Sequence, residues 1–226
     1  MDVIPEDLVL WVDAALLVVN KPAGLPTLPD GYHPSAPHLR SLLEPHFGRL
    51  WTVHRLDKVT SGVLVLTRST EAHRSLNTQF DQHRVVKIYH ALVEGSPAWE
   101  EQTVTVPLRT DGDRRHRTIV DNQGKPAVTH LRILERFEQY SLVEARPETG
   151  RTHQIRAHLA FLGLPLAGDK LYGSRTPFPG QPDLSTELVG LHAWSLELVH
   201  PLTQQRQVFQ AGYPLAWKMA LSSLRA

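Results

Sequence analysis

The 226-residue chain contains no cysteine. This absence excludes a disulfide framework, a thiolate zinc site, an iron–sulfur cluster and a cysteine nucleophile, and it favours a reducing compartment. Long apolar runs are also missing, because Asp13 interrupts the stretch 8–19 and a spanning helix needs about 20 residues. Residues 1–7 carry acids where a signal peptide has bases. We therefore expect a cytoplasmic protein without a membrane segment.

Excess charge and cofactor motifs are lacking as well. The 24 Lys and Arg residues nearly balance the 23 Asp and Glu residues, so the net charge of +1 demands no polyanionic partner. A Gly-rich phosphate loop is absent, since Gly124-Lys125 is followed by Pro126, which has no hydroxyl to hold a metal. His153 and His158 do not share the i, i+4 face of a zinc helix. We expect neither a cofactor nor a metal.

What is present is a globular pattern rich in short strands. Apolar residues make up 41% of the chain, enough for a core, and we expect one domain over residues 1–226. The fold class that this pattern favours is mixed α/β, with a largely antiparallel or mixed central sheet flanked by helices and long loops. Strand patterns occupy 16–20, 63–66, 88–93, 103–108, 118–120, 128–134, 140–145 and 188–199. Helical patterns occupy 38–47, 72–80 behind the N-cap Ser69, 152–162 and a C-terminal segment around Trp217.

The segment 53–63 places Asp57 between Arg55 and Lys58, in a turn just before a buried strand. Such a turn exposes a side chain on a rigid support. Nearby cations keep a carboxylate ionised, and an ionised aspartate can be a nucleophile. The alternative is that Asp57 caps the turn or pairs with a surface cation.

A second cluster spans 148–158, where Arg151 stands at the entrance of a predicted helix and Arg156 lies more than a turn further along. A helix N-terminus with guanidinium groups suits a carboxylate or a phosphate. A solvated basic helix face is the alternative. Lys87 and Tyr89 point to one face of a predicted strand, a position in which a tyrosine usually packs in a core or interface.

Together, these segments resemble the RluA-type pseudouridine synthases over roughly residues 8–215. The motifs that match occur in the order of that family: Asn20-Lys21-Pro22-Ala23-Gly24-Leu25; His54-Arg55-Leu56-Asp57 with Thr60-Ser61-Gly62; Lys87-x-Tyr89; Gly150-Arg151-Thr152-His153-Gln154-Ile155-Arg156; Gly163-x-Pro165-x-x-Gly168-Asp169-x-x-Tyr172; and Leu191-His192-Ala193 with His200-Pro201.

The resemblance implies a pseudouridine synthase catalytic fold and a role for each matched residue. Asp57 is expected to be the catalytic nucleophile, Arg151 its ion-pair partner and Tyr89 the ring packed against the target base. Arg55 is similar to the arginine that enters the RNA stack where the uridine leaves. His54, Thr60 and Arg156 are further expected RNA contacts. We expect a compact member of the family without a separate N-terminal S4-type module. The proline-rich Leu25-Pro26-Thr27 departs from the family pattern and touches no predicted catalytic residue.

The implied reaction is an isomerisation in which the N1–C1′ bond of a uridine breaks and C5 bonds to C1′. Asp57 could attack C1′, add to C6 or help to remove a ribose proton, and the sequence leaves these routes open. The target nucleotide must leave the RNA stack. The expected partner is RNA, either tRNA or large-subunit rRNA or both, bound by a monomer without an obligate protein partner.

The stretch 109–117 is a candidate RNA contact outside the motifs. It holds four arginines, among them Arg114 and Arg115, against two aspartates. We expect a hairpin that contacts phosphates through Arg114 and Arg115, and a merely charged, exposed turn is equally consistent.

Two other functions remain possible. A catalytically silent RNA-binding protein of the same fold would be signalled by loss of Asp57, which is present. A nucleoside or nucleotide glycosidase would need a second carboxylate to handle water, and Glu148 is the only nearby candidate.

Overall fold

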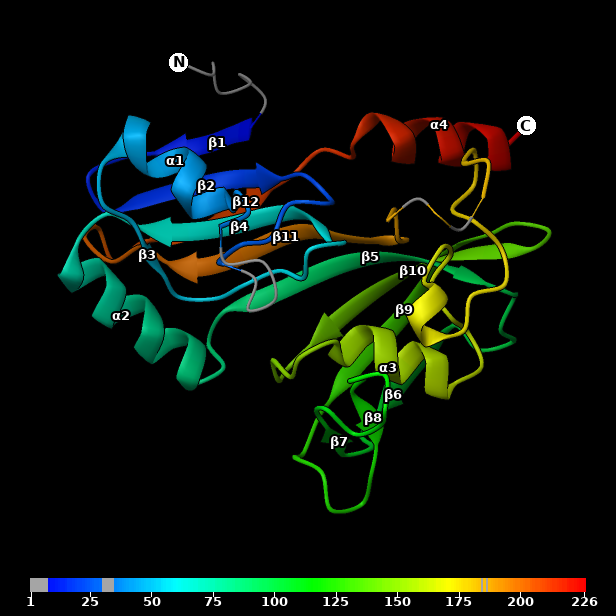
Figure 1. Cartoon of the computed structure of the whole chain (residues 1–226). Coiled ribbons are helices and arrows are strands. Elements are labelled where there is room, and N and C mark those ends of the chain that lie inside the picture. Colours follow the sequence, from blue (N-terminus) through cyan, green and yellow to red (C-terminus); the bar gives the residue numbers. More distant parts are fainter. Residues whose placement is uncertain (1–7, 30–34, 184, 186) are drawn as a thin grey trace. The chain divides into compact units, whose positions relative to one another are not determined.

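The computed structural model describes residues 8–29, 35–183, 185 and 187–226, and these form two compact units (Figure 1). The first unit comprises residues 1–86 and 193–212, and the second comprises residues 87–192 and 213–226. The chain passes from one unit to the other within β5 (Val86–Glu94) and within β11 (Leu191–Val199). The single domain expected over residues 1–226 stays a prediction.

In the first unit, strands pair around a buried centre. The further elements are β1 (Val9–Val12), β2 (Leu16–Lys21), β3 (Trp51–Thr52), β4 (Ser61–Thr67), β12 (Arg206–Gln210), α1 (Leu39–Phe47) and α2 (Thr70–Asp81). β2 pairs antiparallel with both β1 and β4, β3 pairs with β4, and β12 pairs with β11. All seven residues of β4 are buried, which explains its unbroken apolar run. Ala72 and Leu76 bring α2 into the core of this unit.

In the second unit, four strands pair antiparallel in the order β5, β10, β9, β6. Its further elements are β6 (Glu101–Val104), β7 (Leu108–Arg109), β8 (Ile119–Val120), β9 (Thr129–Arg136), β10 (Tyr140–Pro147), α3 (Gln154–Phe161), the 3₁₀ helix η2 (Lys170–Tyr172) and α4 (Leu215–Leu224). β7 and β8 form a separate hairpin. Trp217 of α4 is fully buried and packs with Leu92, Leu142 and Phe178.

The mixed fold class and its mostly antiparallel sheet are confirmed, although β1, β3 and β12 were not expected, and two expected elements differ for a local reason. The strand expected over 103–108 is split into β6 and β7, because Pro107 interrupts it and has no N–H to donate. The helix expected from Thr152 begins only at Gln154, since His153 has the left-handed φ of 51°. No helix among the described residues is long and apolar enough to cross a membrane.

Candidate active site

Asp57 stands at the start of a tight turn that leads into β4. Its carbonyl oxygen accepts a hydrogen bond from the Thr60 N–H at 3.0 Å, which closes the turn. Thr60 and Ser61 are 2% and 1% exposed, so the far end of the turn is anchored in the core. Asp57 itself is half-buried, and its neighbours Arg55 and Lys58 are exposed. The structure thus presents this carboxylate on a rigid support, as the sequence predicts.

Lys21, the last residue of β2, fixes the same turn from inside the first unit. Its side chain is fully buried. Its Nζ donates to the carbonyl oxygens of Pro22 at 2.8 Å, Leu25 at 2.7 Å and Lys58 at 3.3 Å. The Gly24 N–H also donates to the Lys58 oxygen, at 2.8 Å. Residues 21–25 and the Asp57 turn are therefore bonded together.

The charge of Lys21 is electrostatically coupled to Asp57. Burial lowers the pKa of Lys21 from 10.5 to about 7, and the negative charge of Asp57 opposes that fall. Lys21 was not predicted as a site residue. Its place at the end of an apolar strand was nevertheless a signal, because a lysine buried there must have its charge satisfied.

Thr27 holds the residue that precedes Asp57. Its Oγ1 donates to the Leu56 carbonyl oxygen at 2.9 Å and accepts from the Leu56 N–H at 3.3 Å. One hydroxyl thus satisfies both backbone groups of a residue that is 4% exposed. The variant segment Leu25-Pro26-Thr27 therefore supports the Asp57 turn, although it touches no predicted catalytic residue.

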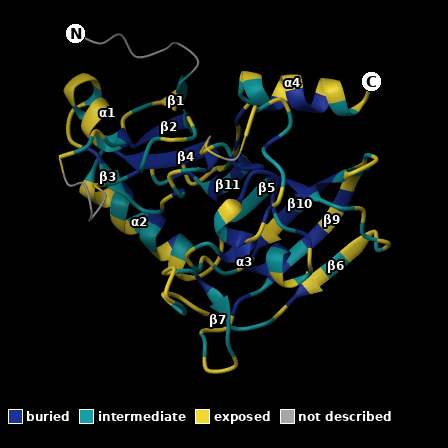
Figure 2. Cartoon of the chain, turned by 45° about the vertical axis from the view of Figure 1, so that its right-hand side comes forward, coloured by how far each residue is buried: buried dark blue, intermediate teal, exposed yellow. Residues whose placement is uncertain are grey.

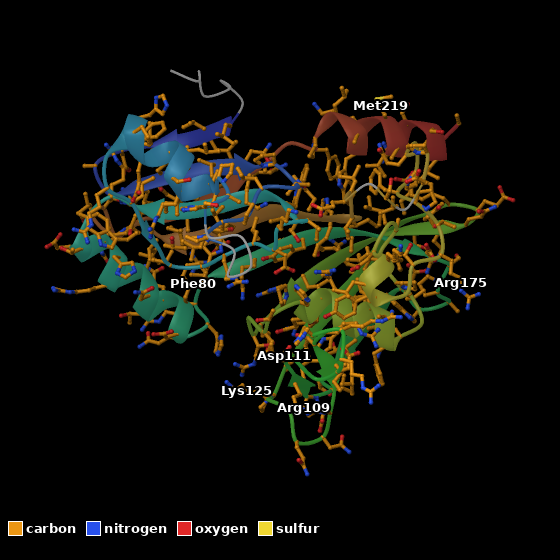
Figure 3. All side chains as sticks on the ribbon, in the orientation of Figure 1. Phe80, Arg109, Asp111, Lys125, Arg175 and Met219 are labelled. Carbon is orange, nitrogen blue, oxygen red and sulfur yellow. The ribbon has the colours of Figure 1, made fainter. Side chains whose placement is uncertain are left out.

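His54 and Thr60, both expected RNA contacts, are built into the fold. The Nε2 of His54 accepts from the Val65 N–H at 3.0 Å, and its ring stacks on Phe80, labelled in Figure 3, with centroids 4.8 Å apart. The Thr60 hydroxyl is buried and finds no hydrogen-bond partner in the part of the chain that the structure describes. Arg55, the expected RNA contact between His54 and Asp57 in the sequence, is exposed.

In the second unit, Gln154 organises the turn that carries Arg151. Its Oε1 accepts from the Thr149 hydroxyl at 2.7 Å and from the Arg151 N–H at 3.0 Å. Its Nε2 donates to the Val128 carbonyl and the Thr129 hydroxyl, both at 2.9 Å. All four hydrogen-bonding positions of this buried amide are used. Gln154 thereby fixes the backbone of Arg151.

Three further side chains lie in this part of the second unit: Arg151 on the turn, and Lys87 and Tyr89 on β5. The Nε of Arg151 donates to the Pro126 carbonyl at 3.0 Å. Lys87 and Tyr89 both lie on β5 and are half-buried, and the Nζ of Lys87 donates to the Thr149 carbonyl at 3.2 Å. Sequence reasoning singled out Tyr89 and Arg151 but gave Lys87 no role.

Arg156 is buried and paired with an aspartate of its own unit. Its guanidinium forms two hydrogen bonds to Asp169, of 2.7 and 2.9 Å, and lies 4.8 Å from the centroid of the Tyr172 ring. The two charged side chains are 5% and 1% exposed. Such a buried bidentate pair fastens α3 to the segment before η2. Arg156 is thus engaged within the fold, and its direct contact with RNA stays a prediction.

The arginines of the β7–β8 hairpin are of two kinds, those in ion pairs and those exposed at the tip. Arg109 pairs with Asp121 and Arg117 with Asp113, each at 2.6 Å. Arg114 and Arg115 at the tip are exposed. The tip appears as an exposed loop in Figure 2, and Figure 3 labels Arg109 and Asp111 at its base. The hairpin thus holds its stem with internal ion pairs and leaves the two tip arginines in solvent.

Comparison with known proteins decides the family. The model of the family described as RNA pseudouridylate synthase matches residues 15–161, well over half of the chain. The chain belongs to the RNA pseudouridine synthase family. It is therefore a member of a family of RNA-modifying isomerases, as the motifs indicated, and the matched region includes Asp57, Tyr89 and Arg151.

Two relatives and one solved structure illustrate this membership. This chain is 42% identical to an uncharacterized RNA pseudouridine synthase of Chloroflexus aurantiacus, over 91% of this chain and 66% of that protein. It is 38% identical to the ribosomal large subunit pseudouridine synthase D of Pseudomonas aeruginosa, over 96% and 71% of the two chains. Human RNA pseudouridylate synthase domain containing 4 has the same fold, with a TM-score of 0.76, 27% identity and coverage of 96% and 92%. The chain thus spans about two thirds of the first two relatives.

Proposed function

We propose that this chain converts specific uridines in structured RNA to pseudouridine, with Asp57 as the nucleophile. The observation that carries the proposal is the Asp57 turn, in which Lys21, Thr27 and Thr60 fix the backbone on both sides of a carboxylate. A nucleophile that is already held in one orientation lowers the activation barrier, because no entropy is lost in ordering it during the reaction. The family membership supplies the reaction.

The reaction is an isomerisation, so the protein must hold the detached base and transfers no group to a second molecule. The N1–C1′ bond breaks, uracil turns while it is held, and a C5–C1′ bond forms. C5 then loses its proton and N1, which carried the broken bond, gains one, so atoms and electrons balance without a second substrate. For Tyr89 we propose packing against the base, for Arg151 pairing with the Asp57 carboxylate, and for Arg55 entry into the vacated stack. These three roles follow from the motifs.

For the RNA we propose stem-loops of large-subunit rRNA or of tRNA, in the cytoplasm. The relative in Pseudomonas aeruginosa carries the large ribosomal subunit in its name, which makes rRNA the first substrate to test. We propose that the β7–β8 hairpin contacts phosphates through Arg114 and Arg115, since its remaining arginines are taken up by internal ion pairs.

The decisive test measures tritium release from C5-labelled uridine in rRNA and tRNA transcripts, comparing wild type with Asp57→Asn. We expect release by wild type and a loss of roughly 10³-fold or more in the variant, as is typical when a nucleophile is removed. If neither protein releases tritium from any RNA while both bind it equally, the alternative of a catalytically silent RNA-binding protein replaces this proposal.

A second test addresses the hairpin. Changing Arg114 and Arg115 to Glu should weaken RNA binding and flatten the dependence of log Kd on log salt by about one unit or more. Arg175→Glu makes the same kind of charge change at an exposed arginine on another loop (Figure 3). Equal effects of the hairpin and Arg175 variants would show a general charge effect and would refute the hairpin contact.

A further inference from the structure

Lys87 holds a charge that its unit does not neutralise. Its ammonium group is half-buried on β5, and within the described parts of the chain it forms one hydrogen bond, to the neutral carbonyl of Thr149, and no ion pair. Burial lowers the pKa of Lys87 from 10.5 to about 8, so the group is still mostly a cation at pH 7. A single carbonyl poorly compensates the loss of water around a charge.

The fold thus accepts an unfavourable arrangement at this position. An apolar side chain would fill the same space without the desolvation penalty. Departures of this kind from the most stable choice occur at sites that bind something from outside. The missing partner for a buried ammonium group is an anion.

The neighbours of Lys87 indicate which anion that is. Lys87 and Tyr89 are two residues apart on one strand, so their side chains leave the same face of β5 about 7 Å from each other. Gly150 lies beside the ammonium group, since a Cβ atom there would be 4.0 Å from Nζ. The glycine therefore leaves open the space beside the nitrogen, next to the turn that carries Arg151.

We propose that Lys87 binds a non-bridging phosphate oxygen of the substrate RNA at the target nucleotide. The inference rests on the proposed function, in which the target base packs against Tyr89. A nucleotide held in this way brings its own phosphate close to its base, and phosphate is the anion that RNA carries at every residue. Lys87 would then help to set the register of the flipped nucleotide, as phosphate contacts do in general.

The competing explanation is that Lys87 only clamps the Thr149 carbonyl and so supports the Arg151 turn. The two explanations differ in their effect on stability. Lys87→Met removes a clamp in one case and an unsatisfied charge in the other. We expect the melting temperature of Lys87→Met to equal or exceed that of the wild type.

Binding is measured in an Asp57→Asn background, so that turnover does not intervene, with rRNA and tRNA stem-loops at several salt concentrations. Lys87→Met should weaken binding roughly 10-fold and reduce the salt slope by about 0.7–0.9, the value for one lost phosphate contact. Lys87→Arg should retain the slope because it retains the charge. Lys218→Met removes an exposed lysine from α4 and is the matched control.

In an RNA that the wild type modifies, a methylphosphonate placed at one phosphate flanking the target uridine gives a sharper test. It should weaken binding when Lys87 is present and have little further effect in Lys87→Met. A lower melting temperature for Lys87→Met with an unchanged salt slope would overturn the proposal and leave the clamp. A changed slope, together with no tritium release by the protein that retains Asp57, would support the phosphate contact while refuting the proposed catalysis.

Discussion

At the scale of single residues, Lys21 and Asp57 are coupled through their charges. Because the charge of Asp57 raises the pKa of Lys21 against the effect of burial, Asp57→Asn should lower that pKa further, below about 7. The protonated fraction of Lys21 at pH 7 should therefore fall when the carboxylate is removed. Heteronuclear NMR of the lysine Cε resonance, followed as a function of pH, measures this directly.

The matched control is Asp81→Asn, which removes an acid at the end of α2. A Lys21 titration midpoint that is the same in wild type and Asp57→Asn would show that the two charges are not coupled. Lys21 would then act on the turn only through its hydrogen bond to the Lys58 carbonyl oxygen.

Thr27 offers a test of how the Asp57 turn is supported. Thr27→Val leaves both backbone groups of the buried Leu56 without their partner, and should lower the free energy of unfolding by about 1–3 kcal/mol. Pseudouridine formation should fall as well, because Leu56 precedes Asp57. Thr27→Ser keeps the hydroxyl and should restore most of both. Urea unfolding and tritium release measure the two effects, and a Val variant as stable as wild type would contradict this role.

The residues that sequence analysis found differ from those it missed in the range of their contacts. Asp57 was visible because its basic neighbours adjoin it in the chain. Lys21 and Thr27 act on the same turn across 37 and 29 residues, and no local pattern records contacts at that distance. The same holds for Arg156: its basic neighbourhood is local, whereas its partner Asp169 lies 13 residues further on and was not predicted.

At the scale of elements, Gly62 lets β4 approach β11 closely. Its φ is +113°, and a Cβ atom there would come within 2.2 Å of the Ala193 carbonyl oxygen. Gly62→Ala combines backbone strain with a clash against another backbone, so it should cost about 3 kcal/mol or more in stability. Gly173→Ala is the control, since Gly173 also has a positive φ but nothing within 4 Å, and it should cost only about 1 kcal/mol. Equal losses in urea unfolding would show that strain alone matters at Gly62.

The elements that were predicted well are those with strong local signals. β2 and β4 have unbroken apolar runs because nearly all of their residues are buried, and Ser69 caps α2 through a hydrogen bond to the Ala72 N–H at 3.1 Å. β12 went unpredicted because only Phe209 among its five residues is buried. Its identity as a strand comes from pairing with β11, which is a tertiary contact.

At the scale of the whole molecule, buried neutral histidines make the free energy of unfolding depend on pH. His90 is 7% exposed, and its Nδ1 lies 2.5 Å from the Tyr213 hydroxyl. Burial, followed by the charges of His192 and Arg132, lowers the pKa of His90 from 6.5 to about 4. Burial also lowers the pKa of His158, although a hydrogen bond to Val106 opposes this. These groups resist protonation only while the chain is folded.

The sign of the effect follows from which state binds the proton. Between pH 6.5 and 4 the unfolded chain protonates this histidine and the folded chain does not, so the free energy of unfolding should fall as pH decreases through that window. The share of His90 is at most about 3 kcal/mol and is complete below pH 4. In His90→Gln the amide can still bond to Tyr213 but cannot titrate, so its unfolding free energy should fall less steeply over the same window. Parallel curves for variant and wild type would exclude His90 as the source, and the remaining slope of the variant comes from the other titrating groups, among them His158 and carboxylates whose pKa the fold lowers, such as Glu135.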